Sequence, residues 1–162
     1  MVNDSGDDLL SSTYGLRGVR FRLCDDWFFV DLLRVREIVR PTELRSIDGI
    51  PPFFAGAMTY RGEELLVLDL RERLNLPGGR REPDARIMLL TMPGKLLGVL
   101  VDEVSELLTL DLDTIRPPPS QLSSHIAPFF IGVADLRERT VTLLNIDRLL
   151  SAEELSHLHR LV

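Results

Sequence analysis

The sequence has little of several features that would mark a secreted or membrane protein. It contains one cysteine, Cys24, so no internal disulfide can form and an oxidising compartment is not required. Asp25 and Asp26 follow Cys24 and are expected to raise the pKa of its thiol, which makes it a poor nucleophile. No run approaches the roughly 20 apolar residues of a spanning helix, and residues 1–13 do not have the pattern of a signal peptide. We therefore expect a cytoplasmic protein without direct membrane insertion.

Basic residues are fewer than acidic residues. The chain has 19 Lys and Arg residues against 25 Asp and Glu residues, and its formal net charge of −6 argues against general binding to a nucleic-acid backbone. It contains no P-loop, no G-x-G-x-x-G loop and no cluster of Cys or His residues. We expect no nucleic-acid partner and no cofactor.

Few residues could support catalysis. His125 lies in a Ser-rich loop, and His157 and His159 lie two positions apart on a predicted helix, which is a poor spacing for a metal pair. Asp102 and Glu103 would point to opposite sides of a predicted strand, so they form no acid–base pair on one face. We interpret them as solvated surface residues, and we expect a protein that is not an enzyme and binds no metal.

What the sequence does contain is a long internal repeat. The segment PFFAGAMTYRGEELLVLDLRERL begins at Pro52, and PFFIGVADLRERTVTLLNIDRLL begins at Pro128, so the copies align without a gap at an offset of 128 − 52 = 76 positions. Gly62, which follows an arginine in the first copy, becomes Glu138 in the second. With 44% hydrophobic and 27% charged residues, the chain has the composition of an ordinary globular protein.

The order of shorter segments before each copy is repeated as well. VRFRL and WFFVDLL, separated by a turn at residues 24–26, predict a hairpin that VREIV follows. From residue 86, RIMLL and LLGVLV predict a second hairpin with its turn at residues 92–95, and VSEL then echoes VREI. Each half therefore predicts a hairpin, a V-x-E-[IL] segment and one long copy of the repeat.

This pattern predicts a mainly β fold with two small β-barrels that share a hydrophobic core. The predicted divisions are a flexible acidic leader at 1–15, lobes at about 16–74 and 86–150, an exposed linker at 75–85 and a C-terminal helix at 151–162. Three successive prolines at 117–119 exclude that segment from a central strand, because they carry no backbone donor.

Four residues are predicted to cap helices. Asp69 and Asn145 occupy equivalent N-cap positions in the two copies, and Ser151 with Glu154 has the spacing of a capping box. The apolar stripe that follows Ser151 predicts that the terminal helix packs back on the body of the protein.

Two equivalent glycines also carry a prediction. Gly56 and Gly132 are kept at the same place in the two copies, where a side chain would collide with a facing strand or the backbone would need a positive φ.

The first copy resembles a known family. GAMTYRG followed by LLVLDLRERL resembles the Gly-x-x-Asn-Leu-Arg-Gly and L-P-V-V-D-L motif of the CheW-like adaptors of bacterial chemotaxis. VREIVRP, LLGVLVDEVSELL, TIRPPP and LLNIDRLLSAEEL match further blocks of that family in the same order. The resemblance extends from about residue 16 to residue 158, and five ordered blocks make it highly specific.

The resemblance implies two five-stranded SH3-like barrels around a shared core, with no enzymatic activity. It implies an adaptor that couples the cytoplasmic tips of chemoreceptors to the regulatory domain of a CheA-type histidine kinase, in the cytoplasm at membrane-bound receptor arrays. The receptor- or kinase-binding residues it implies are Val35, Glu37, Ile38, Arg61, Gly62, Val101 and Val104. For the four aliphatic residues among them, barrel core is the alternative interpretation, and Glu37 and Arg61 are the favoured contacts.

Some positions depart from the family motif. Thr59 and Tyr60 replace its Asn-Leu, and Leu66 replaces its proline, which leaves the choice of partner open. One alternative function is a scaffold of a chemosensory pathway that controls pili or gliding, and another is a small-ligand barrel with Trp27 as a pocket wall. Arg61 is expected to face the partner, whereas the equivalent Arg137 is expected on a solvated face; the alternative for Arg61 is a plain hairpin turn.

Overall fold

The computed structural model describes residues 15–119, 127–136 and 139–161, which are mainly β-strand. The strands are β1 Gly15–Leu23, β2 Asp26–Asp31, β3 Val35–Val39, β4 Phe54–Tyr60, β5 Glu63–Asp69, β6 Arg86–Met92, β7 Lys95–Val101, β8 Glu103–Asp111, β9 Ile115–Arg116, β10 Phe130–Leu136 and β11 Arg139–Leu144. The helices are α2 Leu70–Arg73 and α3 Ala152–Leu161, with short 3-10 turns η1 Leu32–Arg34, η2 Leu112–Thr114, η3 Ala127–Phe129 and η4 Ile146–Arg148. Both predicted hairpins, β1–β2 and β6–β7, are present.

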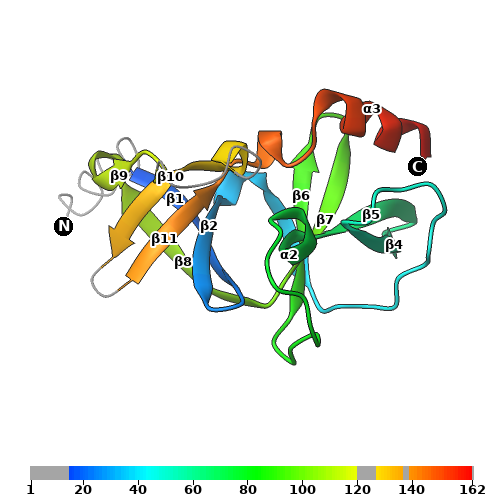
Figure 1. Cartoon of the computed structure of the whole chain (residues 1–162), viewed down its shortest axis with the longest axis horizontal. Coiled ribbons are helices and arrows are strands. Elements are labelled where there is room, and N and C mark those ends of the chain that lie inside the picture. The colour runs from blue at the N-terminus through cyan, green and yellow to red at the C-terminus, as the bar shows by residue number, and fades with distance from the viewer. Residues whose placement is uncertain (1–14, 120–126, 137–138, 162) are drawn as a thin grey trace, which may run out of the picture.

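The strands form two sheets that lie side by side (Figure 1). One has the order β8-β1-β2-β11-β10-β9 and the other has the order β3-β6-β7-β5-β4. The predicted mainly β fold with two lobes and a C-terminal helix is confirmed. The two-residue strand β9 gives the first sheet a sixth member, and the proline run follows it at the sheet edge.

The repeat is reproduced in the strand register. Phe54 pairs with Leu68 in β4–β5, and Phe130 pairs with Leu144 in β10–β11, so both pairs are related by the offset of 76. Each hairpin also has a register shift directly after its phenylalanine. Equal sequence therefore produces equal hairpins, including the position of the bulge.

Glycine occurs at the same position in both copies of the repeat for a steric reason. A Cβ at Gly56 would lie 2.8 Å from the carbonyl oxygen of Arg45, and one at Gly132 would lie 2.6 Å from the carbonyl oxygen of Arg116. Gly56 also has a φ of 147°. The predicted collision with a neighbouring strand is confirmed at both positions, because these carbonyls belong to the segments that pair with β4 and β10.

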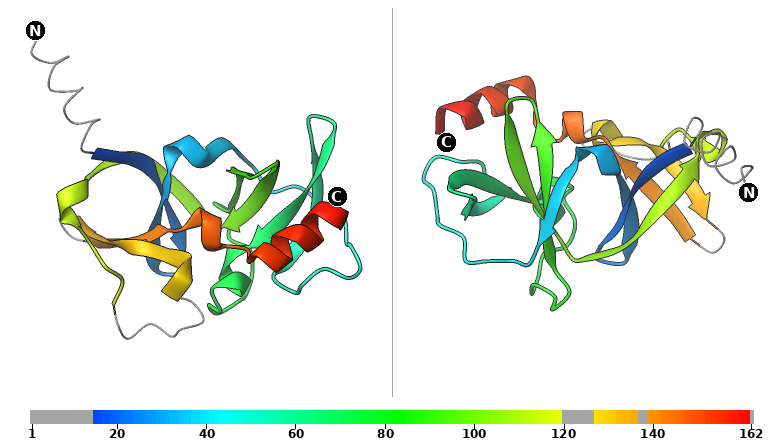
Figure 2. Two further views of the ribbon diagram at one scale, coloured as in Figure 1. Left: turned by 90° about the horizontal axis from the view of Figure 1, so that it is seen from above. Right: turned by 180° about the vertical axis from the view of Figure 1, so that it is seen from behind.

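The lobes do not follow the predicted division of the chain at 16–74 and 86–150. The β1–β2 hairpin of the first half lies in the sheet with β8, β10 and β11, and the β6–β7 hairpin of the second half lies with β3, β4 and β5. The two halves have thus exchanged their hairpins (Figure 2). Only one residue, Asp102, separates β7 from β8. A tight hairpin that returned β8 beside β7 would need at least two loop residues, so the chain instead continues into the other lobe.

A hydrophobic core shared by the two lobes fills the space between the sheets. It includes Phe21 and Phe28, whose ring centroids lie 5.6 Å apart, together with Leu66 and Met88 from the other sheet. Two smaller clusters lie on the opposite faces of the sheets. Strands β6 and β7 are buried on both faces over most of their length, which explains their almost continuous apolar sequences, whereas β1 alternates between buried and partly exposed residues from Val19 onward.

The predicted helix caps are confirmed in two cases of three. The side chain of Asp69 accepts a hydrogen bond from the backbone N–H of Arg71 at 3.1 Å. Ser151 and Glu154 form the capping box, with reciprocal hydrogen bonds of 2.8 and 3.0 Å. Asn145 lies at the N-cap position of η4 and its backbone carbonyl accepts a hydrogen bond from Arg148, but its side chain makes no cap hydrogen bond, so the predicted side-chain cap is wrong.

The terminal helix α3 packs on the shared core through Leu155, as predicted. Among the described residues, no helix is long and apolar enough to cross a membrane. The predicted leader at 1–15 lies almost wholly outside the described residues, as do His125, Arg137 and the side chain of His159.

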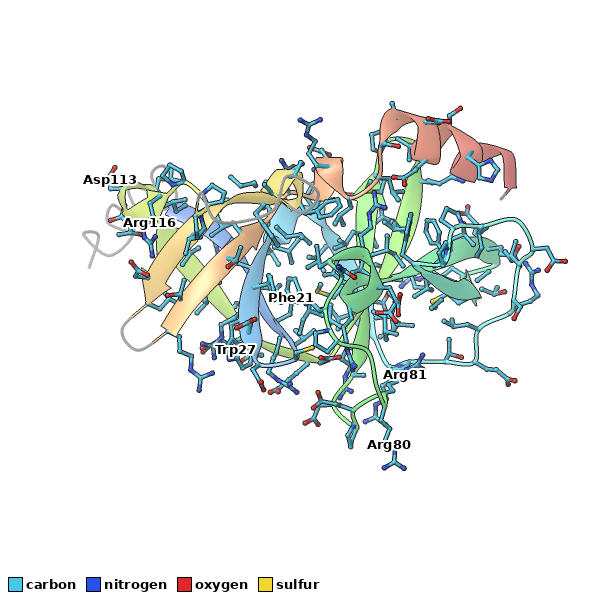
Figure 3. All side chains as sticks on the ribbon, viewed as in Figure 1. Phe21, Trp27, Arg80, Arg81, Asp113 and Arg116 are labelled. Atoms are coloured by element: carbon cyan, nitrogen blue, oxygen red, sulfur yellow. The ribbon has the colours of Figure 1, made fainter. Side chains whose placement is uncertain are left out.

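The linker at 75–85 is attached to the body more firmly than its composition predicts. Arg22 donates two hydrogen bonds to the carboxylate of Glu82, at 2.8 and 3.2 Å. Arg80 and Arg81 project from this segment and are exposed (Figure 3).

Candidate functional site

Glu37 on β3 and Arg61 after β4 meet on the surface of the five-stranded sheet. These strands are at opposite ends of the sheet order, but the hydroxyl of Tyr60 donates a hydrogen bond to the Glu37 carboxylate. The guanidinium of Arg61 lies 3.5 Å from the same carboxylate oxygen. The sheet therefore curls until its two edges meet, as a barrel requires, and it brings the two favoured residues together.

The turn that carries Arg61 requires a glycine at its second position. Tyr60 pairs with Glu63, which leaves a two-residue loop in which Arg61 has a φ of 50° and Gly62 a φ of 81°. Positive φ at both positions is typical of a type I′ hairpin turn, where glycine is favoured. The Arg61 side chain is 78% exposed, so this turn presents a guanidinium to solvent.

Tyr60 gives the cluster a feature that the leucine of the family motif cannot supply. The hydrogen bond to Glu37 raises the pKa of Tyr60, and partial burial raises it further. The phenol therefore stays protonated near neutral pH and remains a donor to Glu37. The Cζ atom of Arg61 lies 5.3 Å from the centroid of the Tyr60 ring, so one phenol contacts both charged partners.

A second group of predicted residues lies around a surface hollow of about 320 Å³. Ile38 and Val104 line it, together with three charged residues, Asp84, Arg86 and Glu103. Ile38 is 36% exposed, so part of its apolar surface is available to a partner. The lining of this hollow therefore combines two aliphatic side chains with three charged ones of both signs.

The remaining two predicted contacts are more deeply placed. The first, Val35, is partly buried against the shared core. Val104, described above at the hollow, also packs against this core with part of its surface. Val101 is 1% exposed and belongs to that core, because it ends the central strand β7 with its side chain toward the other sheet. For Val101 the structure supports the alternative interpretation, barrel core, and corrects its assignment to a binding surface.

The prediction that Asp102 is a solvated surface residue is wrong. Asp102 is 3% exposed and accepts hydrogen bonds from the backbone N–H of Cys24 at 2.6 Å and from Arg71 at 2.9 Å. Glu103 points elsewhere, to Arg22, so the two carboxylates do lie on different faces. Alternation predicted their directions, but it could not show that the hairpin tip at Cys24 covers one of them.

Cys24 is not activated for chemistry. Burial raises the pKa of its thiol, and the negative charge of Asp102 raises it further. The direction is the predicted one, although Asp102 contributes more than the neighbouring Asp25 and Asp26. In the described ranges, no group of three or more His, Cys, Asp or Glu residues is arranged to hold a metal ion.

Comparisons with known proteins agree with the fold and the motif. The family model described as CheW-like domain matches residues 17–154. The chain is 29% identical over 148 residues to the chemotaxis protein CheW of Klebsiella aerogenes, covering 91% of this chain and 89% of that protein. It is 31% identical over 138 residues to a probable chemotaxis protein CheW of Rhizobium etli, covering 84% and 88%. The crystal structure of the scaffolding protein TtCheW from Thermoanaerobacter tengcongensis superposes with a TM-score of 0.79 at 25% identity, covering 86% of this chain and 94% of that one.

Proposed function

The chain belongs to the CheW-like family, and from this membership we propose that it is a non-enzymatic adaptor that couples chemoreceptors to a CheA-type histidine kinase. The match spans residues 17–154, so both lobes are included. Relatives of similar length are chemotaxis proteins, and a structural relative is a scaffolding protein. We place its action in the cytoplasm, at membrane-bound receptor arrays.

One observation carries the location of the binding surface: Glu37 and Arg61 come from the two edges of one barrel and form a single exposed cluster. A partner that contacts the cluster meets an acid, a phenol and a guanidinium held in fixed relation. Such preorganisation reduces the loss of side-chain entropy on binding. We assign Glu37, Arg61 and Gly62 to the contact surface with the receptor tip or the kinase regulatory domain.

The apolar part of the surface is supplied by Ile38 and Val104 at the hollow, while Val35 lies partly buried against the shared core. A mixture of apolar contacts and rim charges is typical of non-obligate interfaces, which bind reversibly. Val101 contributes through the core that holds these strands in place, since its own side chain is buried.

Tyr60, which replaces the leucine of the family motif, is expected to influence which partner binds. Its hydroxyl engages the Glu37 carboxylate, so a partner that binds Glu37 must accommodate or replace that hydrogen bond. Contacts at such flanks discriminate between related partners by both attraction and repulsion.

The function is tested by reconstitution of the purified chain with a receptor signalling fragment in vesicles and a CheA-type kinase. We expect the chain to co-sediment with both and to make kinase autophosphorylation depend on the receptor. The chain alone should neither hydrolyse ATP nor accept phosphate from it. The proposal fails if the kinase responds to the receptor equally with and without the chain, or if the chain stays in the supernatant.

A further inference from the structure

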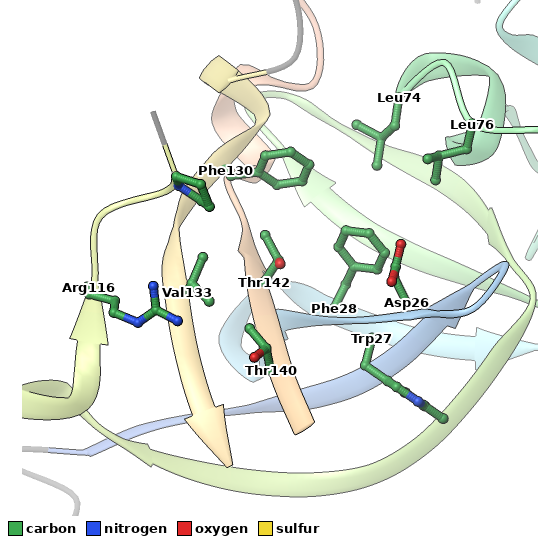
Figure 4. A pocket seen from close by; sticks show the side chains of 11 residues that line it. Asp26, Trp27, Phe28, Leu74, Leu76, Arg116, Phe130, Val133, Thr140 and Thr142 are labelled. Carbon is green, nitrogen blue, oxygen red and sulfur yellow. The ribbon is translucent and has the colours of Figure 1, made fainter. Parts of the chain in front are cut away.

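A cavity of about 300 Å³ lies between the six-stranded sheet and the chain that follows α2 (Figure 4). It shares no residue with the Glu37–Arg61 surface. Most of its wall is apolar, formed by Trp27, Phe28, Leu74, Leu76, Pro119, Phe130 and Val133. Its volume is near the lower end of the range for small-molecule sites, about 300–1,000 Å³.

Some polar side chains that line the cavity have hydrogen-bond partners within the described part of the chain, and others do not. Arg116 and Thr140 both bond to the carboxylate of Asp135, so neither is free for a ligand. Among the described contacts, the Asp26 carboxylate and the Thr142 hydroxyl make no hydrogen bond or ion pair, and both side chains line the cavity. The cavity therefore offers one unpaired negative charge and one free hydroxyl beside an apolar wall.

The internal repeat shows that this opening is not a requirement of the fold. Thr142 is equivalent to Leu66, which is 2% exposed and fills the shared core of the other lobe. Leu74 is equivalent to Leu150, after which α3 continues and covers the core through Leu155. After Leu74 the chain turns into the linker instead, so the six-stranded lobe keeps a cavity at a place that the five-stranded lobe fills.

We propose that this cavity binds a small organic amine with an aromatic or branched apolar body. The rings of Phe28 and Phe130, stacked with centroids 6.0 Å apart, supply an apolar surface for the body of the ligand. The Asp26 carboxylate favours an ammonium group at the rim, where a carboxylate ligand would be repelled. Thr142 supplies a hydrogen bond of either polarity. The site is independent of the adaptor function and of its binding surface.

Trp27 provides the measurement, since it is the one tryptophan of the chain and lines the cavity. Phenethylamine is titrated into the full-length protein while Trp27 fluorescence and the indole N–H resonance are recorded. We expect saturable binding with a dissociation constant of about 1 mM, a realistic value for a ligand of this size. 3-Phenylpropionate, which has a similar body and the opposite charge, should bind at least about fivefold more weakly because of Asp26.

Three variants make the test specific. Asp26→Asn should weaken phenethylamine binding about threefold or more and abolish the preference over 3-phenylpropionate, whereas Asp25→Asn, a matched change of charge outside the cavity, should have an effect below about 1.5-fold. Thr142→Leu, which places the residue of the first copy in the second, should reduce binding about tenfold or more by filling the space. No saturable response to phenethylamine, equal binding of the two probes, or equal effects of Asp26→Asn and Asp25→Asn would overturn the proposal. The Asn pair decides the question even if Thr142→Leu does not fold.

Discussion

Arg73 donates hydrogen bonds to both carboxylate oxygens of Glu154, at 2.7 and 3.2 Å, and thereby joins α2 to the start of α3. The Cζ atom of the same guanidinium lies 4.1 Å from the ring centroid of Phe53 and 5.0 Å from that of Phe129. These two phenylalanines are equivalent in the repeat, at the offset of 76. A single arginine at the boundary between the lobes therefore fixes the terminal helix to both copies.

Glu154 is expected to stabilise the fold through this contact and through the capping box. Glu154→Ala removes the carboxylate that Arg73 and Ser151 share, so it should lower the free energy of unfolding by about 1–2 kcal/mol. Glu153→Ala, a matched change at an exposed position one residue earlier, should stay within about 0.5 kcal/mol. Urea denaturation of both variants measures the difference, and equal midpoints would contradict the role of Glu154.

The contribution of Glu154 should also depend on pH. Burial alone would raise the pKa of Glu154, but the hydrogen bonds from Ser151 and Arg73 outweigh it and hold the pKa below its ordinary value of 4.5. The folded state therefore binds this proton less readily than the unfolded state, and the stabilisation is complete above about pH 4.5 and lost as pH falls through the folded pKa. The stability difference between the parent and Glu154→Gln should shrink between about pH 6 and pH 3. A constant difference across that range would exclude this linkage.

The two glycines of the repeat should be equally intolerant of side chains. Gly56→Val and Gly132→Val force a side chain against a backbone carbonyl, so each should cost more than about 1 kcal/mol of unfolding free energy. Gly78 is the control, because the nearest atom that its Cβ would meet is a flexible Glu72 carboxylate oxygen at 3.8 Å. Gly78→Val should melt close to the parent protein. Unchanged melting temperatures for both repeat variants would refute the steric explanation.

The Arg71–Asp102 pair should be the most sensitive ionic contact of the fold. Its side chains are 13% and 5% exposed, so Asp102→Asn leaves the Arg71 charge without its counter-ion. Loss of one partner of a buried pair costs about 3–5 kcal/mol, and we expect an effect near the lower figure because Arg71 retains some exposure. Glu103→Gln should cost less than about 1 kcal/mol, since that carboxylate is 36% exposed and Arg22 keeps Glu82. Chemical denaturation that ranks the two variants equally would contradict this assignment.

The sequence predicted the hairpins, the glycine positions and the terminal helix because these depend on local pattern. Gly56 and Gly132 could be paired in advance since the repeat has no gap. The exchange of hairpins could not be predicted in the same way. A repeat shows which segments are alike, but it does not show which of the two equivalent hairpins pairs with the strands of a given half. Only the one-residue connection at Asp102 excludes an arrangement with β8 beside β7.

The binding cluster was predicted in part. Glu37 and Arg61 were indicated by their motifs, which lie far apart in sequence, and the closure of the barrel brings them together. The hydrogen bond from Tyr60 was missed, because a single aromatic departure from a motif does not reveal which side chain faces it. Val101 was assigned to the surface by resemblance, although burial on both faces of β7 places it in the core.

We propose that the turn at Arg61 contacts a signalling partner, and reversing the charge of Arg61 tests this contact. Arg61→Glu places a second carboxylate beside Glu37 on an exposed turn, so we expect folding to change little. Binding to the receptor tip or to the kinase regulatory domain should weaken by about 1–3 kcal/mol. Arg80→Glu is the matched control, an exposed arginine on the linker away from the cluster, and should stay within about 0.5 kcal/mol.

Calorimetric titration of the parent and both variants against the two partners, with thermal melts of each, is the decisive measurement. We expect that Arg61→Glu alone loses affinity for at least one partner while all three proteins melt at similar temperatures. Equal affinities of Arg61→Glu and the parent for both partners would contradict it and remove the Glu37–Arg61 cluster from the binding surface.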